Sequence, residues 1–563
     1  MGERVLMMME PGESDTQSRK KQNHTYKQSF LRGAVYLSLA ALIVKVLSAV
    51  YKVPYQNITG DTGFYVYQQV YPFYGIALVM ATYGFPVIIS KLVADEFEQN
   101  GRGAVRSILA VSFVTVGIVN FVLGGLLIAL APYLAGWMGD PGLVMPLRGM
   151  AAPFFIMPFV SVLRGYYQGL HWMTPSAVSQ VGEQFVRVAV ILVLSAWAMS
   201  NYGPYEAGTA AAAGSFFGAG AAFLILLAAG KKYTKNSFST HNGNGTHIKW
   251  KEQSIAILTG GFFVCLSAMS LIAMQLIDSF TLIRLLRFSG FTLEAAGILK
   301  GVYDRGWPVV QLGTVLTTSF SLSLVPMVAK AALRHDRKLQ QQYTIRALKT
   351  GAVFGGAAAV GLASVMPSLN PMLFTDTSGQ TALQVISFSV LPASVFLTGA
   401  AILHGAGKGR SLLGLTAAGL FLKAAGNAVF VPAFAINGAA LATLISFSVM
   451  AVMLGAVLYR YELLVFSEKR AGRTVRWAAA LLLTGITAFL WQSGTIAVLH
   501  AWTEAGSRTA MTAAALSASS AGAVVFLAAA VKLGVVTKEE WGALPKLGSV
   551  LEKFERKKGA DRQ

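Results

Sequence analysis

The chain has 563 residues, of which 54% are hydrophobic and 13% charged, and its mean hydropathy is +0.56. The hydrophobic residues come in long blocks, so the composition indicates a protein that crosses a membrane many times. The formal charge of +21 would suggest nucleic-acid binding in a soluble protein, but in a membrane protein its distribution among loops matters more, and no nucleic-acid partner is expected.

The chain begins with a polar stretch, residues 1–28, which has no hydrophobic core before a cleavage site and is therefore not a signal peptide. We expect a disordered cytoplasmic tail here. The single cysteine, Cys265, lies in a hydrophobic block, so an internal disulfide and a thiolate metal cluster are both excluded. The sequence predicts neither a cofactor nor a metal.

Runs long enough to span a bilayer, at about 20 residues for about 30 Å of hydrocarbon, follow one another with mostly short connections. The sequence therefore predicts an all-α polytopic membrane protein with fourteen transmembrane helices. They fall at residues 29–53, 62–90, 104–133, 144–167, 176–200, 205–229, 253–283, 303–328, 346–366, 381–404, 411–431, 437–459, 475–494 and 509–533.

Basic residues alternate between the loops as the positive-inside rule requires, which places both termini in the cytoplasm. The basic loops include Lys91 with Arg106, the linker 230–252, and Lys469 with Arg470, whereas the loops on the other side are nearly free of charge. One outer connection disagrees. It carries Arg284, Arg287, Lys300 and Arg305. Either some of these residues belong to helix ends that face an interior, or the helix boundaries are misplaced.

An internal repeat relates the first twelve helices. Gly165 and Pro86 recur, each with similar neighbours, as Gly405 and Pro326, at a common offset of 240 residues. This offset contains an even number of spans, so the halves have the same orientation and form two six-helix bundles, 29–229 and 253–459, around a cleft. The last two helices, in 475–533, lie outside the repeat.

The segment 534–563 reads as a cytoplasmic amphipathic tail. Hydrophobic residues such as Leu547 and Leu551 share one helical face, and Lys553, Arg556 and Lys557 lie elsewhere. Basic residues beside an apolar face favour contact with anionic lipids of the cytoplasmic leaflet.

A few charged residues fall inside the predicted spans, where each would cost about 2.5–3.5 kcal/mol at the bilayer centre, so we expect them to face inward. Four are positive and two negative, a balance that favours an anion such as a pyrophosphate. They are Lys45, Glu183, Arg187, Asp278 and Lys423, with Arg305 added from the anomalous loop. By the repeat, Glu183 and Lys423 should be equivalent and face each other across the cleft.

Purely structural roles stay open for these charges. Glu183 could pair with Arg187 one turn later, and Asp278 with Lys45 or Lys423, simply to hold helices together. Gln180 shares a helical face with Glu183, and Gln275 lies one turn before Asp278, so both are candidates for helix pairing or ion coupling.

Glycine and proline residues mark bends. Gly84, Pro86 and Pro326 are candidate hinges for alternating access, although proline kinks occur in membrane helices of every kind. Coupling to a proton or sodium gradient, or to the membrane potential, is left open.

These residues together resemble the multidrug/oligosaccharidyl-lipid/polysaccharide exporter superfamily, in the branch of the stage V sporulation protein B-like proteins related to the murein lipid II flippases. The most specific marks are the motif Arg164-Gly-Tyr-Tyr-Gln-Gly169, the Gly84-Phe-Pro86 turn, Asp278, and Lys408 with Lys423 and Asn427. The resemblance implies a V-shaped pair of bundles that moves an undecaprenyl-pyrophosphate-linked sugar to the outer leaflet.

The resemblance also implies a cationic cavity, since the murein lipid flippases carry essential arginines in their first, second and eighth helices. Here Lys45 and Arg305 look like counterparts of two of them, a third is displaced to Lys52, and the position in the second helix, near Ile76, has no charge. This departure leaves the substrate's identity open.

The leading hypothesis is a flippase in the bacterial cell membrane that acts as a monomer on a lipid-linked oligosaccharide, with Lys45, Arg187, Arg305 and Lys423 binding the pyrophosphate. Three alternatives stay open. A cation-coupled multidrug exporter of the same fold should have an acidic cavity, a glycosyltransferase or polymerase should have a large outer loop with paired carboxylates, and a scaffold should need no buried charges.

Overall fold

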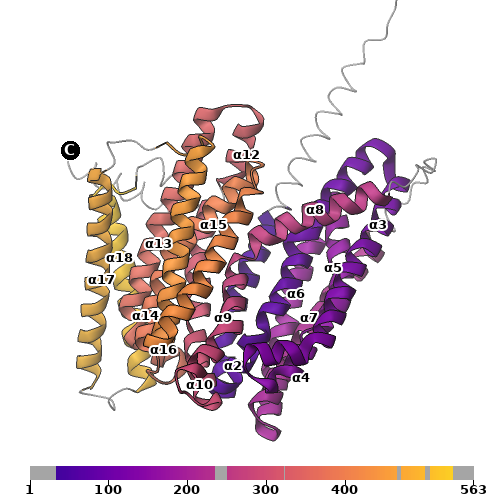
Figure 1. The fold of residues 1–563 in the computed structure, drawn as a ribbon. Helices are drawn as coiled ribbons and strands as arrows, with labels where there is room; N and C mark the ends of the chain where they lie inside the picture. Colours follow the sequence, from indigo (N-terminus) through magenta and orange to yellow (C-terminus); the bar gives the residue numbers. More distant parts are fainter. Residues whose placement is uncertain are drawn as a thin grey trace, which may run out of the picture.

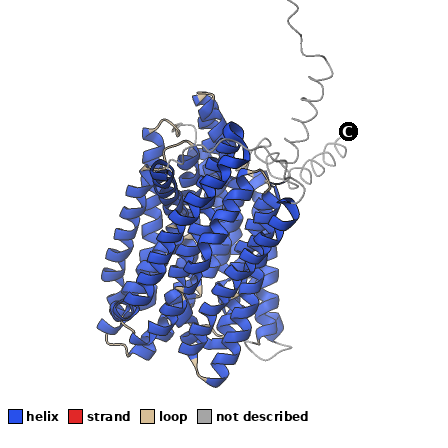
Figure 2. Ribbon diagram, turned by 90° about the vertical axis from the view of Figure 1, so that its right-hand side faces the viewer, coloured by secondary structure: helices blue, strands red, loops and turns tan. Residues whose placement is uncertain are grey.

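The computed structural model describes residues 33, 35–234, 250–322, 324–465, 471–500 and 507–536, and every regular element in these ranges is helical (Figure 2). The predicted tail 1–28, the middle of the basic linker and most of the predicted amphipathic tail lie outside the described residues.

The N-terminal lobe, residues 35–234, begins with a helical run from residue 35 that continues into α2 (Lys52–Val79). In this lobe α6 packs along α7, and α3 packs along α5 (Figure 1). Its other elements are the π-helix η1 (Met80–Gly84), α3 (Phe85–Met138), η2 (Pro141–Leu143), α4 (Val144–Gly149), α5 (Ala152–Gly169), α6 (Met173–Asn201) and α7 (Pro204–Thr234).

The C-terminal lobe, residues 250–465, is centred on the packing of α13 against α11 and α15, with α16 against α9 and α15. The last two helices pack on each other and on α13, at the side of this lobe (Figure 1). The elements are α8 (Trp250–Ala268), α9 (Ser270–Phe288), α10 (Leu293–Asp304), α11 (Gly306–Leu322), α12 (Val325–Leu333), α13 (Arg337–Phe374), α14 (Gln380–Phe388), α15 (Val390–Gly405), α16 (Ser411–Arg460), α17 (Ala471–His500) and α18 (Arg508–Lys532).

The described part of the chain has 10 helical runs long and apolar enough to cross a membrane, or up to 11 if α8 and α9, which are bent by 74°, form one span. Two runs, 35–99 and Ser411–Arg460, are each long enough to hold two predicted spans, and their backbones leave the helical region at Gly60 and Ala435. Many-spanning helical architecture is thus confirmed, whereas the number fourteen and the repeat stay predictions.

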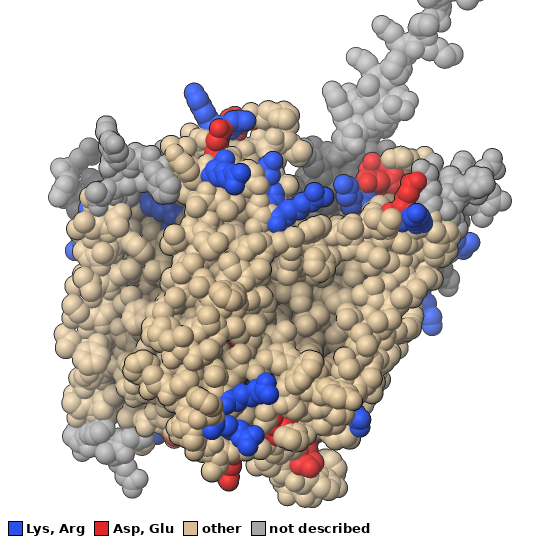
Figure 3. Space-filling view, in the orientation of Figure 1, with Lys and Arg blue, Asp and Glu red and all other residues tan. Residues whose placement is uncertain are grey.

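Charged side chains are distributed as a membrane requires. On the face shown in Figure 3 they gather near the two ends of the molecule, and the broad middle is almost uncharged. We call these ends the α12 end and the α10 end after the helices that lie there (Figure 1). An almost uncharged middle between polar ends is the surface expected where acyl chains contact a protein.

The anomalous basic connection divides into two kinds of residue. Arg284 and Arg287 are exposed on the last turns of α9, whereas Lys300 and Arg305 are buried in and directly after α10. Two of the four basic residues therefore face the protein interior from a helix end, as one of the two explanations expected.

The lobes touch chiefly through three helices of the C-terminal lobe: α8 packs on α3 and η1, α9 packs on α2 and α3, and α10 packs on α2. Gly301 permits the contact of α10 with α2, because a Cβ there would lie 2.2 Å from the backbone oxygen of Asp61. This junction at the α10 end brings charged residues of both lobes together.

Candidate functional site

Six lysine or arginine residues are buried in the described part of the chain, and four of them form ion pairs with carboxylates. A buried charge is costly unless it is paired and hydrogen-bonded. The paired cations are neutralised by a carboxylate, whereas the unpaired ones leave a net positive charge inside the protein. The paired cations are Arg164, Lys300, Arg305 and Lys423, and the unpaired ones are Lys52 and Arg187.

Arg164, near the end of α5, ties α5 to α6. Its Nη2 lies 2.7 Å from Oε2 of Glu183, and its Nε donates to Ser179 Oγ at 3.1 Å. Glu183 also accepts a hydrogen bond from Tyr74 of α2 at 3.3 Å. Glu183 therefore pairs with Arg164 and not with Arg187, and the partner that sequence reasoning missed lies within the motif that it had singled out.

Arg187 is fully buried in α6 among tyrosines of the first two spans. Its Nη2 donates to Tyr51 and Tyr67 at 2.8 and 3.2 Å, and its Nη1 donates to Tyr74 at 3.4 Å. The guanidinium carbon also lies over the rings of Tyr74 and Tyr71, at 4.4 and 5.8 Å from their centroids. Nη1 also donates to Gln184 Oε1 at 3.1 Å, so the positive charge is held by neutral hydroxyls, one amide oxygen and ring faces, with no carboxylate in contact among the described residues.

Lys52 shares one of these rings. Its ammonium lies 4.2 Å from the centroid of Tyr71 and has no hydrogen-bond partner in the described residues, although its side chain is fully buried. It interacts electrostatically with Arg187 and with Asp304 of α10, which places it where the two lobes meet. Lys52 falls at the end of a predicted span, so the hydrophobicity of the surrounding sequence gave no reason to place its side chain in the protein interior.

Lys45 lies two helical turns before Lys52, on the same face of the same helical run. It is partly exposed, and no ion pair or hydrogen bond to its side chain is present within the described ranges. Among the described residues, Lys45, Lys52 and Arg187 are thus three cations that form no ion pair with a carboxylate, and we call them the cation row.

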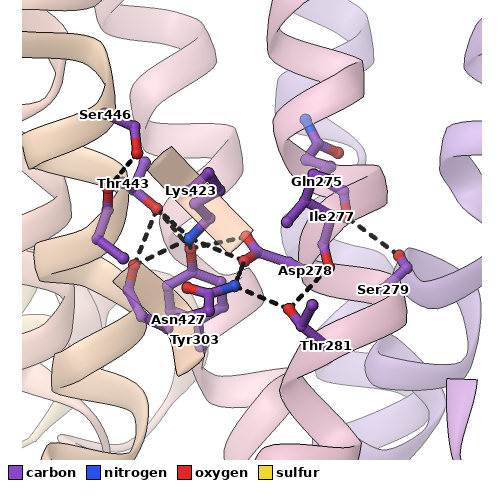
Figure 4. Close-up of polar contacts among 12 residues, drawn as sticks. Gln275, Ile277, Asp278, Ser279, Thr281, Tyr303, Lys423, Asn427, Thr443 and Ser446 are labelled. Carbon is purple, nitrogen blue, oxygen red and sulfur yellow. Dashed lines mark hydrogen bonds and ion pairs between the residues drawn. The ribbon is translucent and has the colours of Figure 1, made fainter. Parts of the chain in front are cut away.

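Lys423, on α16, is paired inside the C-terminal lobe (Figure 4). Its Nζ lies 2.7 Å from Oδ1 of Asp278 on α9, and both side chains are fully buried. Asn427 donates to the same Oδ1 at 2.9 Å, and Tyr303 donates to Oδ2 at 2.9 Å. Lys423 and Glu183 each have an ionic partner within their own lobe, and the expectation that they face each other across a cleft stays a prediction.

Arg305 joins the two lobes at the α10 end. Its Nη2 lies 2.6 Å from Asp61 of the N-terminal lobe and 2.7 Å from Asp376, which follows α13 in the C-terminal lobe. Partial burial acts to raise the pKa of Asp376, but the hydrogen bonds and charge of Arg305 and the backbone N–H of Ser378 outweigh it, so this pKa is lowered. Both carboxylates are occupied by one guanidinium, and we call these three residues the interlobe clamp.

The remaining predicted residues have structural surroundings. Gln180 is buried on α6 one turn before Glu183, and Gln275 of α9 is partly buried with its Oε1 unpaired among the described groups.

One ion pair was not predicted from the sequence: the charged atoms of Lys300 and Asp304 are 2.6 Å apart inside α10. Lys300 and Asp304 are four residues apart, a spacing that allows an ion pair on a helix. The sequence predicts Lys300 in an outer loop, so this pair was not expected. The described residues contain no cluster of three or more His, Cys, Asp or Glu side chains suited to a metal ion.

Of the predicted hinges, Gly84 has the clearest structural signature. It ends the π-helix η1, and Pro86 lies in the first turn of the next helix, α3. Pro326 lies likewise in the first turn of α12. A π-helical turn is a frequent mark of functional bending, so η1 supports the hinge prediction without testing it.

The sequence model of a family described as "Polysaccharide biosynthesis protein" matches residues 30–332. The chain is 40% identical to "Uncharacterized membrane protein YabM" of Bacillus subtilis (strain 168), over 94% of this chain and 97% of that protein. It is 27% identical to "Stage V sporulation protein B" of the same organism over 74% of this chain and 81% of that protein, and 24% identical to its "Lipid II flippase MurJ" over 77% and 84%.

Solved structures share the fold. "Lipid II flippase MurJ, inward closed conformation" superposes with a TM-score of 0.61 at 13% identity, covering 89% of this chain and 97% of that chain. An inward-facing multidrug resistance MATE family transporter of the MOP superfamily gives a TM-score of 0.60 at 17% identity, covering 77% and 98%.

Proposed function

Because the chain belongs to the polysaccharide biosynthesis protein family, a branch of the MOP superfamily, we propose that it moves an undecaprenyl-pyrophosphate-linked oligosaccharide from the inner to the outer leaflet of a bacterial cell membrane. Similarity to flippases over most of the chain supports a transporter and not an enzyme. Peptidoglycan precursors and polysaccharide units are the two cargoes that this proposal covers.

The observation that carries the proposal is the cation row. A buried charge without an ionic partner is costly, and no ion pair in the described residues offsets this cost at Lys52 or Arg187. An anionic headgroup would offset this cost when it binds. A pyrophosphate carries several charged oxygens and fits a row of cations, whereas a cationic drug would be repelled.

Alternating access is supported by the arrangement of contacts between the lobes. The interlobe clamp and the packing of α10 on α2 join the lobes at the α10 end. By the positive-inside assignment, this end faces out of the cell, so cargo would enter from the cytoplasmic side. Within the proposal, Lys45, Lys52 and Arg187 bind the headgroup, Arg305 controls closure, and Glu183, Asp278 and Lys423 hold helices together.

The test is depletion of the protein in its native host, with lipid-linked precursors measured separately on each leaflet. We expect precursors to accumulate on the inner leaflet while synthesis continues. Unchanged precursor distribution with increased drug sensitivity would instead identify a multidrug exporter and would refute the flippase.

Variants of the cation row give a sharper test in complementation. Lys52→Met and Arg187→Met remove charge at nearly constant volume and should abolish rescue of the depleted strain. Arg187→Lys keeps the charge and should retain more activity than Arg187→Met. Arg148→Ala is the matched control, because Arg148 is exposed on the short helix α4. Full rescue by both methionine variants would refute the proposal that the cation row binds a pyrophosphate.

A further inference from the structure

In the described part of the chain, every hydrogen bond and ion pair of the Lys423 ammonium is made with an oxygen atom. Besides Asp278 Oδ1 at 2.7 Å, it contacts Thr443 Oγ1 at 2.6 Å, the backbone carbonyl of Ala439 at 3.0 Å and the hydroxyl of Tyr303 at 3.3 Å (Figure 4). These four oxygens come from α9, α10 and the second half of α16, and we call them the oxygen cage. All of the side chains are buried, so the cage is closed to solvent.

The donor set is that of a hard cation and not of an ordinary surface salt bridge. One carboxylate, one backbone carbonyl and two hydroxyls are the ligand types that bind alkali and alkaline-earth ions. Since the cage holds a single carboxylate, one positive charge neutralises it, which favours a monovalent ion over a divalent one. Asn427 and Tyr303 also hold the Asp278 carboxylate in place by hydrogen bonds of 2.9 Å each.

The backbone also has the form of a cation site. The long helix α16 leaves helical geometry at Ala435, with φ 48° and ψ −128°, and the carbonyl of Ala439 lies one turn further on. In membrane transporters, carbonyls near broken helices commonly coordinate coupling cations. Here such a break lies beside the cage, but a side chain from the first half of the same helix supplies the charge.

We propose that the oxygen cage is a monovalent-cation site whose ion is built into the chain as the ammonium of Lys423. Because this ion cannot leave, the C-terminal lobe works without binding sodium or potassium at this site. A variant that removes the ammonium and leaves its space open should take up a free alkali ion. This inference rests on the membrane-transporter assignment but not on the identity of the cargo.

A matched pair of variants separates this site from a simple ion pair. Lys423→Ala removes the ammonium and leaves a space next to Asp278, whereas Lys423→Met removes the charge and fills most of that space. Both lose the ion pair equally. Only Lys423→Ala can admit an ion, and adding Asp278→Asn to it should abolish that ability by removing the anionic ligand.

The experiment measures the thermal unfolding midpoint of the purified full-length protein in detergent, in NaCl, KCl or choline chloride at equal ionic strength. We expect Lys423→Ala to be stabilised by several degrees in sodium or potassium relative to choline, since a ligand of the folded state raises the midpoint. Wild type, Lys423→Met and Lys423→Ala/Asp278→Asn should respond equally to all three salts.

Two results would overturn the proposal. One is an equal midpoint for Lys423→Ala in all three salts. The other is a Lys423→Ala protein that fails to fold even when it is prepared in sodium or potassium. Because these readouts measure ion binding and not transport, they are independent of the flippase test, and either proposal can fail while the other stands.

Discussion

Arg164 and Arg187 lie on neighbouring helices and show two different uses of a buried arginine. The guanidinium of Arg164 has a carboxylate partner 2.7 Å away, whereas that of Arg187 is surrounded by tyrosine hydroxyls and rings. The first neutralises charge inside a lobe. The second preserves a positive charge in a place from which water is excluded, where its attraction for an anion is strongest.

Removing one partner of the first pair should be costly. We predict that Arg164→Met destabilises the protein by about 3–5 kcal/mol, because Glu183 is left charged and unpaired. The thermal unfolding midpoint measures this loss. The double variant Arg164→Met/Glu183→Gln should recover most of it, and an unchanged midpoint in Arg164→Met alone would contradict the pairing.

The contact that Asp376 makes in the interlobe clamp should respond to pH only in acid. The pKa of Asp376 is lowered in the folded protein, so the stabilisation it contributes is present above its ordinary value of about 4 and is lost as the pH falls further. Asp376 is partly exposed, so solvent screening keeps the effect small. We predict that unfolding midpoints of wild type and Asp376→Asn converge below about pH 4 and differ at neutral pH. If the two midpoints instead differed by the same amount from acid to neutral pH, the proposed role of the Asp376 charge would be contradicted.

At the scale of elements, the break between α2 and α3 allows α8 to approach the N-terminal lobe. A Cβ on Gly84 would lie 2.1 Å from the sulfur of Cys265 on α8, which is closer than any real contact. The glycine predicted as a hinge therefore also has a packing role, because two helices from different lobes meet over it.

We predict that Gly84→Ala separates α8 from η1 and lowers both thermal stability and transport activity. Gly117→Ala is the matched control, since a Cβ there meets nothing within 4 Å. The double variant Gly84→Ala/Cys265→Ala should regain stability, because it removes the clashing sulfur. If Gly84→Ala alone matches the control in both measurements, the close packing of Gly84 against α8 is not needed for stability or transport.

At the scale of the whole molecule, Arg305 joins the lobes through Asp61 but contacts Asp376 within its own lobe. Asp61→Asn therefore weakens a contact between the lobes, which must break when they separate at the α10 end. Asp376→Asn weakens a contact within the C-terminal lobe, which can persist when the lobes separate. The two variants form a matched pair for testing closure.

We predict that Asp61→Asn shifts the population towards separated lobes and that Asp376→Asn shifts it less. Spin labels at exposed Met145 of α4 and Phe291, next to α10, would report the separation as a longer distance distribution. The single cysteine, Cys265, is buried, which favours selective labelling at introduced cysteines. Identical distributions in Asp61→Asn and wild type would show that the clamp does not control closure.

Much of the architecture was predictable because hydrophobicity is a local property of the chain. Within the described ranges the predicted runs lie mainly on helices, and the unusual charges at Arg187, Asp278, Arg305 and Lys423 are buried. Their pairing was not predictable in the same way. The surplus of positive charge lies at Lys52 and Arg187, whereas Lys423 and Arg305, which had been counted in it, have carboxylate partners.

The sequence by itself determined that this chain forms many membrane helices and that certain charges must avoid lipid, because burying a polar group in hydrocarbon is unfavourable whatever surrounds it. Only the tertiary structure decided which charge neutralises which. Arg164 and Glu183 are 19 residues apart and Asp61 and Arg305 are 244 apart, so no local pattern relates them. Since Coulomb attraction depends on distance in space, which cations are neutralised and which are left without an ion pair is decided only when the lobes have folded.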